Sequence, residues 1–203
     1  MRERRRNSPP EFAGPISAIL PAMTPRKKPR RLEPKHVKDI ALDYLAKFAA
    51  SSAKLKQVMK RRIERSAAAH DDDPAPMLSE MDRVLVDLIA KGILNDATFA
   101  EMMTRSLARR GGSQRKISAS LAAKGVSRAD TAQAMAKLRA DEPDAELAAA
   151  VAFAKRRRLG AFRAKTDDTP ERRRKDLGSM ARAGFGMDVA RKALADDGDG
   201  DGA

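Results

Sequence analysis

The stretch MDRVLVDLIAKGILNDATFAEMMTRSLARRGG, residues 81–112, predicts one helix, a sharp stop and a second helix. In its first half, apolar residues recur with the spacing i, i+3, i+4, i+7 and i+8, which is the stripe of an amphipathic helix. These residues are Met81, Val84, Leu85, Leu88 and Ile89. Gly92 then stands where a helix end needs a left-handed residue, because glycine takes positive φ without a steric cost. The first helix is therefore expected to stop at this glycine.

The residues after Gly92 predict how the second helix begins. Ile93 and Leu94 are expected to be buried, and Asn95 or Asp96 can accept hydrogen bonds from the free amides of the first turn. Apolar residues then continue at helical spacing through the second half of the stretch: Phe99, Met103 and Leu107. The whole stretch is therefore predicted to be two helices joined by a short turn.

The same order of features returns twice further along the chain. LAAKGVSRAD, residues 121–130, and MARAGFGMD, residues 180–188, each contain a helix end, a glycine, an apolar residue and a polar helix start. Self-similarity of this kind is typical of proteins in which one small helical unit is stacked several times. Gly125 and Gly184 are expected to play the part of Gly92.

Apolar periodicity over the rest of the chain predicts nine helices in three groups of three, and no strand. The first helix is expected to bury a stripe that ends at Phe48, and HDDDPAP, residues 70–76, reads as a linker because it holds two prolines and three aspartates. We assign a disordered basic arm to 1–32, three-helix repeats to 33–92 (repeat 1), 93–141 (repeat 2) and 142–195 (repeat 3), and an acidic flexible tail to 196–203.

Composition narrows the class of protein. Of the 203 residues 42% are hydrophobic but only 3% aromatic, which suits closely packed helices with an aliphatic core. Cysteine is absent, so disulfides and thiolate chemistry are excluded. No apolar run approaches the ~18 residues that a membrane-spanning helix needs. We expect a cytoplasmic protein that does not bind a membrane.

The chain is strongly basic, with a formal net charge of +14. Residues 1–35 hold 10 basic and 3 acidic residues, and residues 36–195 hold 32 and 21. The last eight residues hold four aspartates and no basic residue. A body of this charge favours an anionic partner, either nucleic acid or the acidic face of another protein.

Catalytic and metal-binding patterns are missing from the sequence. The two histidines, His36 and His70, stand far apart, and neither belongs to an HExxH-type motif. The tail DGDGDG, residues 197–202, copies the opening of a calcium-binding loop, but the later ligands of such a loop do not follow. We therefore expect no enzyme, no cofactor and no metal site.

Clusters of cations are the candidate binding residues. The turn Gly111-Gly112-Ser113 lies between two basic pairs and precedes a helix start, where amides can hold a phosphate or a carboxylate; the alternative is a plain turn between solvated charges. The runs at 155–158 and 172–175 spread around their helices, so one or two residues of each can line a shared surface. The candidate partner-binding residues are Arg105, Arg109, Arg110, Arg115, Lys116, Arg156, Arg157, Arg172 and Lys175.

Five features together resemble the RecX family of bacterial recombinase regulators. They are Tyr44-Leu45 before a serine-capped helix, GILNDATFAE (92–101), RRGGS (109–113), LAAKGV (121–126) and ARAGF (181–185). The resemblance covers about residues 37–195 in the same order. The basic arm, the insert at 70–76 and the aspartate tail depart from the family pattern.

The resemblance implies an all-α fold of three tandem three-helix repeats in an elongated, curved monomer. It also implies a non-enzymatic protein that binds the RecA recombinase filament in its groove, bridges neighbouring subunits, and limits filament assembly, ATP hydrolysis and strand exchange in DNA repair, recombination and the SOS response. The alternative is a sequence-tolerant DNA-binding protein whose helix–glycine–helix units act like helix-turn-helix readers. Under either reading the net charge predicts weak, non-specific binding to single- and double-stranded DNA.

Overall fold

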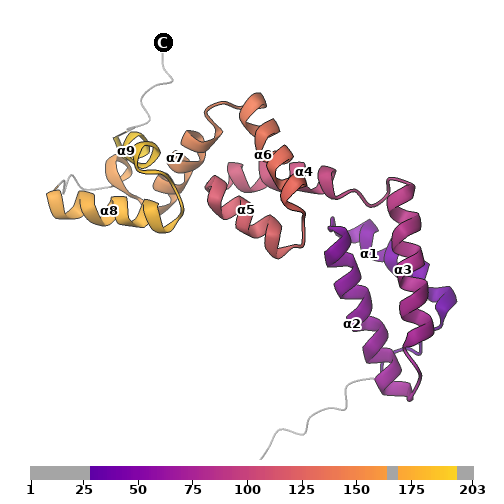
Figure 1. Cartoon of the computed structure of the whole chain (residues 1–203). Helices are drawn as coiled ribbons and strands as arrows, with labels where there is room; N and C mark the ends of the chain where they lie inside the picture. Colours follow the sequence, from indigo (N-terminus) through magenta and orange to yellow (C-terminus); the bar gives the residue numbers. More distant parts are fainter. Residues whose placement is uncertain (1–27, 164–168, 196–203) are drawn as a thin grey trace, which may run out of the picture.

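The computed structural model describes residues 28–163 and 169–195, and within them it contains helices and no strand. The helices form three successive trios (Figure 1), which confirms the predicted all-α class and the three groups. The first trio is α1 (Val37–Lys47), α2 (Ser52–His70) and α3 (Ala75–Ala90), preceded by the short 3-10 helix η1 (Pro34–His36). The second is α4 (Asp96–Arg109), α5 (Gln114–Ala123) and α6 (Arg128–Asp141). The third is α7 (Ala145–Arg157), the 3-10 helix η2 (Gly160–Phe162), α8 (Pro170–Arg182) and α9 (Met187–Ala195).

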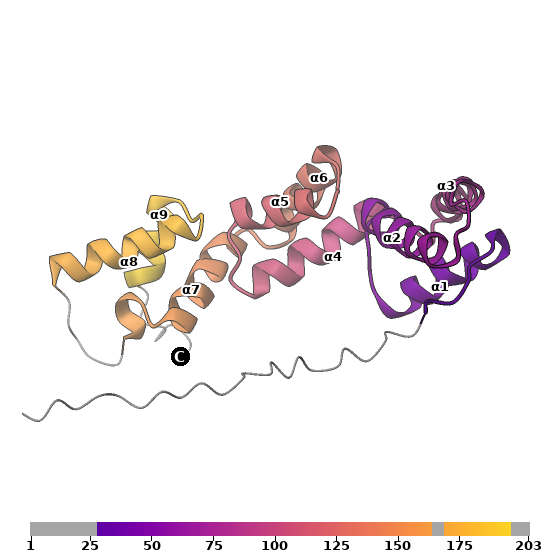
Figure 2. The ribbon, with the colours of Figure 1, turned by 90° about the horizontal axis from the view of Figure 1, so that it is seen from below.

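The trios follow one another along an elongated, curved array. Figures 1 and 2 show α1–α3 at one end, α8 and α9 at the other, and α4 to α7 between them. Helix α4 packs on α6 of its own trio and also on α7 of the next, while α7 packs on α9. None of the described helices combines the length and the apolar character that crossing a bilayer would require.

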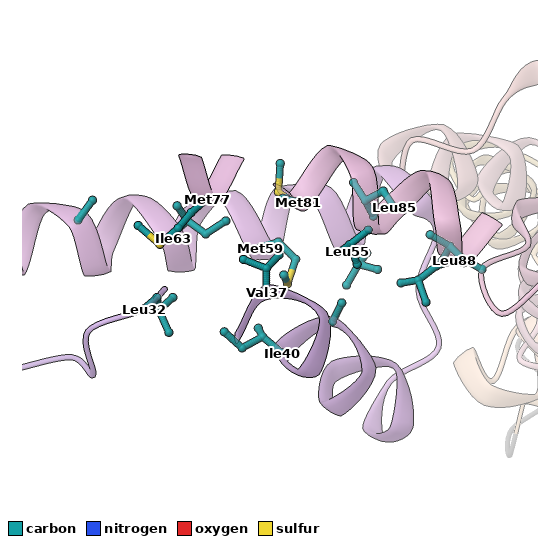
Figure 3. Close-up of a cluster of buried hydrophobic side chains, with 14 residues drawn as sticks. Leu32, Val37, Ile40, Leu55, Met59, Ile63, Met77, Met81, Leu85 and Leu88 are labelled. Atoms are coloured by element: carbon teal, nitrogen blue, oxygen red, sulfur yellow. The ribbon is translucent and has the colours of Figure 1, made fainter. Parts of the chain in front are cut away.

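Each trio has its own hydrophobic core. In the first core, side chains from α1, α2 and α3 point toward one another (Figure 3), and Val37, Leu55 and Leu88 are at most 1% exposed. Burying an aliphatic side chain of this size contributes about 1.5–3 kcal/mol. Leu94 belongs to this first core and Ala145 to the second. The repeat limits assigned from sequence therefore fall a few residues before one core gives way to the next.

Five helices begin at a polar capping residue, and those at Asn95 and Ser113 confirm helix starts predicted from the sequence. In each, a polar side chain accepts a hydrogen bond from the amide three residues further on; the five caps are Ser51, Asn95, Ser113, Ser127 and Thr169. The predicted glycine stops are confirmed as well, since Gly92, Gly125 and Gly184 have φ angles of 70°, 75° and 92°. These signals are local, so the sequence alone is enough to place them.

The repeat register differs from the sequence-based alignment. Gly125 and Gly184 join the second helix to the third within their trios, whereas Gly92 joins one trio to the next. In the first trio the join between the second and third helices is made by Asp71, with φ of 55°. Aspartate is one of the few non-glycine residues that visit this left-handed region readily. In the first trio, the turn that corresponds to those at Gly125 and Gly184 therefore has an aspartate in place of the glycine.

Three apolar residues predicted to be inside are exposed. Phe48 is 56% exposed because α1 stops at Lys47 and the backbone is extended at the next residue. Ile89 and Ile93 are 52% and 53% exposed, so only Leu94 of the pair after Gly92 is buried. In each case the apolar pattern of the sequence extends past the part of the helix that packs on the core.

Two segment boundaries also move. The predicted linker at 70–76 shrinks to the turn at 71–74, because α2 runs through His70 and α3 begins at Ala75 with Pro76 in its first turn. Leu32, assigned to the basic arm, is 6% exposed and packs in the first core, and its amide donates to Ser66 Oγ at 2.9 Å. The predictions for residues 1–27 of the arm and for the tail at 196–203 lie outside the described residues.

Candidate binding surface

Four of the candidate cations surround the turn between α4 and α5. Arg109, Arg110, Arg115 and Lys116 are all exposed. Between them the buried Gly111 presses against α7, where an added Cβ would lie 2.9 Å from the backbone nitrogen of residue 153 and 3.0 Å from the carbonyl oxygen of residue 149. The four cations therefore stand at the contact between repeats 2 and 3.

Two further candidates, Arg156 and Arg157, reach the same place from the end of α7. A guanidinium nitrogen of Arg156 donates to the carbonyl oxygen of Arg110. The guanidinium carbons of Arg156 and Arg157 lie 5.6 Å and 5.9 Å from the centroid of the Phe153 ring, within range of a cation–π interaction. The structure thus brings six of the nine predicted residues to one junction, which we call the basic junction (Arg109, Arg110, Arg115, Lys116, Arg156 and Arg157).

The remaining three candidates lie elsewhere. Arg105 pairs with Asp141 at 2.5 Å and so ties α4 to α6. Arg172 and Lys175 lie near the start of α8, and the far end of that helix is the one beside the basic junction. At 1.5 Å per residue, Lys175 is ~12 Å from that end along the helix axis. These three are therefore separate from the basic junction.

The helix start at Ser113 holds a carboxylate that belongs to the chain itself. The Gln114 amide donates to Glu146 Oε2 at 3.0 Å, and the Lys116 amide donates to Ser113 Oγ at 3.3 Å. The Ser113 hydroxyl donates in turn to the carbonyl oxygen of Ala183 at 2.6 Å. Carboxylate binding, one of the chemistries considered for this turn, is present, and its role is to join repeat 2 to repeat 3.

The first junction repeats this arrangement. Ser51, the cap of α2, donates its hydroxyl to the carbonyl oxygen of Lys124, just as Ser113 donates to Ala183. The Ser52 amide donates to Asp96 Oδ1 at 2.7 Å, in the place of the Gln114–Glu146 bond. In both junctions, the start of one trio's second helix bonds to the next trio at two places. One is a carbonyl oxygen at the end of the next trio's second helix, and the other is an acidic side chain in the first turn of the next trio's first helix. Repeats 1 and 2 are therefore joined by the same kinds of hydrogen bond as repeats 2 and 3.

Glu146 makes the second junction sensitive to pH. The side chain is half-buried, and burial raises its pKa above the ordinary value of 4.5, although the Gln114 amide acts in the opposite direction. Because the pKa of Glu146 is higher in the folded chain than in the unfolded chain, this side chain contributes its full stabilisation below pH 4.5. The stabilisation is lost as pH rises through the folded-state pKa.

We expect Glu146→Gln to gain stability relative to the parent chain as pH increases. The amide oxygen of glutamine keeps an acceptor for Gln114 and carries no charge to desolvate. Urea unfolding of both proteins at several values between pH 4 and pH 7.5 measures the difference in unfolding free energy. If the difference in unfolding free energy stays constant over this range, Glu146 has the same pKa in the folded and the unfolded chain, contrary to this prediction.

The two histidines have structural contacts. His36 Nδ1 accepts from the Glu33 amide at 3.1 Å, and His70 Nε2 lies 2.8 Å from the carbonyl oxygen of Pro29. Within residues 28–163 and 169–195, no group of three or more His, Asp or Glu side chains is arranged to hold a metal ion.

Comparison with known proteins agrees with these features. Residues 95–135 match the family model of the RecX second three-helix domain. The chain is 35% identical over 170 residues to the regulatory protein RecX of Myxococcus xanthus, covering 83% of this chain and 89% of the relative. It is 32% identical over 139 residues to the regulatory protein RecX of Agrobacterium fabrum, covering 68% and 72%. The crystal structure of RecX from Lactobacillus salivarius aligns with a TM-score of 0.61 at 18% identity, covering 81% of this chain and 96% of that one.

The extent of the sequence matches points to one family, and the structural match agrees with its fold. The structural match covers all but a small part of the solved chain, and the match to the Myxococcus relative extends over most of both sequences. This chain belongs to the RecX family of regulatory proteins.

Proposed function

We propose that this chain binds the RecA recombinase filament and modulates, mainly by inhibition, its assembly, ATP hydrolysis and strand exchange. The observation that carries the proposal is the basic junction, six exposed cations held where repeat 2 meets repeat 3 of an elongated array. Membership of a family of regulatory proteins supports a regulatory, non-enzymatic role, and we take the active species to be a monomer in the cytoplasm.

The dimensions of the array suit a polymeric partner. A helix of about 15 residues is ~22 Å long, so three trios end to end reach ~60–70 Å. A ligand of this length in a filament groove contacts more than one subunit. Such a ligand shifts the equilibrium between filament states by its difference in affinity for them. Inhibition follows if the bound state resists the changes that accompany ATP hydrolysis.

Charge indicates which part of the array meets the partner. Repeat 1 has eleven basic and ten acidic residues and is almost neutral. Repeat 2 has nine basic and four acidic residues, and repeat 3 has thirteen and eight. Complementary potentials speed association and fix orientation. We therefore propose that repeats 2 and 3 contact acidic recombinase surface or the DNA that the filament encloses.

ATP hydrolysis by RecA on single-stranded DNA tests the proposal. Addition of the chain at about 200 mM salt, where non-specific binding to DNA is strongly weakened, should lower the hydrolysis rate in a concentration-dependent way. Unchanged hydrolysis together with retention of duplex DNA at this salt would favour the alternative, a sequence-tolerant DNA-binding protein with helix-turn-helix-like units. Weak binding to DNA at low salt does not distinguish the two, because both predict it.

A further inference from the structure

A cavity of about 440 Å³ lies between the segment at 29–32 and α2. Helix α2 is at the opposite end of the array from repeat 3 (Figure 1). Four arginines line it: Arg30, Arg61, Arg62 and Arg65. The side chains of Leu32 and Val58 contribute apolar wall. The cavity therefore combines a concave shape, aliphatic walls and four positive charges, one from the segment before repeat 1 and three from α2.

The four cavity arginines differ from three of the cations nearby, which pair with acids. Outside the cavity, Lys56 pairs with Asp82 at 2.8 Å, Lys60 with Glu64 at 3.7 Å, and Arg31 with Asp72 at 2.5 Å. In the described part of the chain, no carboxylate forms an ion pair with Arg30, Arg61, Arg62 or Arg65, and none lines the cavity. Several neighbouring cations are thus neutralised by an acid, whereas the cavity is a concentrated positive site without a counter-ion in the described part of the chain.

The number of arginines favours phosphate over carboxylate as the ligand. In the ion pairs within this chain, a single arginine pairs with each carboxylate, as Arg105 does with Asp141 and Arg163 with Asp176. Phosphate offers more acceptor oxygens and suits several guanidinium groups at once. No aromatic side chain lines the cavity, so base stacking of the kind seen in many single-strand sites is not provided. The cavity is therefore suited to the backbone of a strand and not to its bases.

We propose that this cavity binds consecutive phosphate groups of a single-stranded nucleic acid, without sequence preference. A flexible strand can place its phosphates in a concave site of this size more readily than a rigid duplex can. The site lies in repeat 1, so it is separate from the basic junction through which we propose that RecA is bound. One chain then has two different anionic ligands at two places along the array.

The test compares two triple variants of the same helix in the absence of RecA. Arg61→Gln, Arg62→Gln and Arg65→Gln remove three charges at the cavity. Lys54→Gln, Lys56→Gln and Lys60→Gln remove three charges outside it. Binding of a labelled 30-nucleotide oligo-dT is measured by fluorescence anisotropy from about 50 to 200 mM salt. Thermal melting of both variants by circular dichroism shows that they are folded.

The cavity variant should lose ~10–100-fold in affinity at 100 mM salt, and its slope of log K against log salt should fall by about 2, as expected for three phosphate contacts to a single strand. The control variant should lose less than about threefold, because the lysines it changes lie outside the cavity. Equal losses in the two variants would overturn the proposal and leave only general electrostatic attraction.

Two competitors separate phosphate strands from other anions. ADP should bind far more weakly than oligo-dT, and poly-glutamate should bind both variants alike. Poly-glutamate binding that falls as much as oligo-dT binding in the cavity variant would overturn the proposal in favour of an acidic protein segment. ADP binding lost in that variant with oligo-dT binding unchanged would overturn it in favour of a nucleotide. Since RecA is absent from these assays, none of the outcomes bears on the proposed inhibition.

Discussion

Reversing the charge of Arg109, Arg110, Arg115 and Lys116 to glutamate should raise the concentration needed for half-maximal inhibition of RecA ATP hydrolysis at least about tenfold, equivalent to about 1.4 kcal/mol or more of binding free energy. The four side chains are exposed and lie on both sides of the Gly111 contact. Placing like charges against an acidic partner weakens binding and also slows association. Hydrolysis is measured with single-stranded DNA near 200 mM salt, where weak electrostatic contacts to the DNA contribute little.

A matched variant controls for total charge. Lys35, Lys38, Lys47 and Lys91 are exposed on repeat 1, and their reversal changes the net charge by the same amount. This control should inhibit hydrolysis within about twofold of the parent chain, and circular dichroism should show unchanged helical content in both variants. Equal losses in the two would show that overall charge is what matters. Full inhibition by the first variant would show that the turn at Gly111 is only a connection between helices.

The largest effect on stability is expected from Gly125→Ala. A side chain at the φ of +75° costs about 1–2 kcal/mol. The added Cβ would also lie 2.3 Å from Cβ of Ala53, which is closer than two carbon atoms can approach. Overpacking at a tight contact costs a further ~1–3 kcal/mol. Because Ala53 is in repeat 1 and Gly125 in repeat 2, the clash acts on the first junction.

Gly92→Ala is the matched control for this substitution. Its φ is +70°, almost the same, but nothing lies within 4 Å of the added Cβ. Gly92→Ala should therefore lose only the backbone cost of about 1–2 kcal/mol, and Gly125→Ala should lose clearly more. Urea unfolding at equal pH and salt measures the two losses. Equal losses would mean that the contact between Gly125 and Ala53 does not contribute to stability.

Much of the fold could be predicted because its signals are short-range. The cap at Ser113 and the stops at Gly125 and Gly184 depend on residues within one helical turn, and the structure confirms them. Periodicity was less reliable at helix ends. It extended the first stripe to Phe48, although α1 ends at Lys47 and leaves that ring without a core to cover it.

The junctions could not be predicted from one sequence. Ser51 donates to Lys124, 73 residues away, and Ser113 to Ala183, 70 residues away. A serine at a helix start looks the same in the sequence whether its hydroxyl faces water or the carbonyl of the next trio. The pairing of Glu146 with the amide of Gln114 has the same long-range origin.

The candidate site was predicted in part. Clustering of basic residues along the sequence found the cations around Gly111, and the fold added Arg156 and Arg157 from α7. The arginine cavity of repeat 1 was missed for a physical reason. Helical periodicity places Arg61 and Arg65 on the outward face of α2, and only the segment at 29–32, assigned to a disordered arm, turns that face into the wall of a cavity.

Under the proposed function, this array lies along a RecA filament and touches neighbouring subunits. Electron cryo-microscopy of RecA filaments assembled on single-stranded DNA and saturated with the chain tests it most directly. We expect a curved density of three helical trios in the groove, with repeats 2 and 3 against the filament and contacts to at least two subunits. Density confined to a single subunit, or to naked DNA beside the filament, would contradict it.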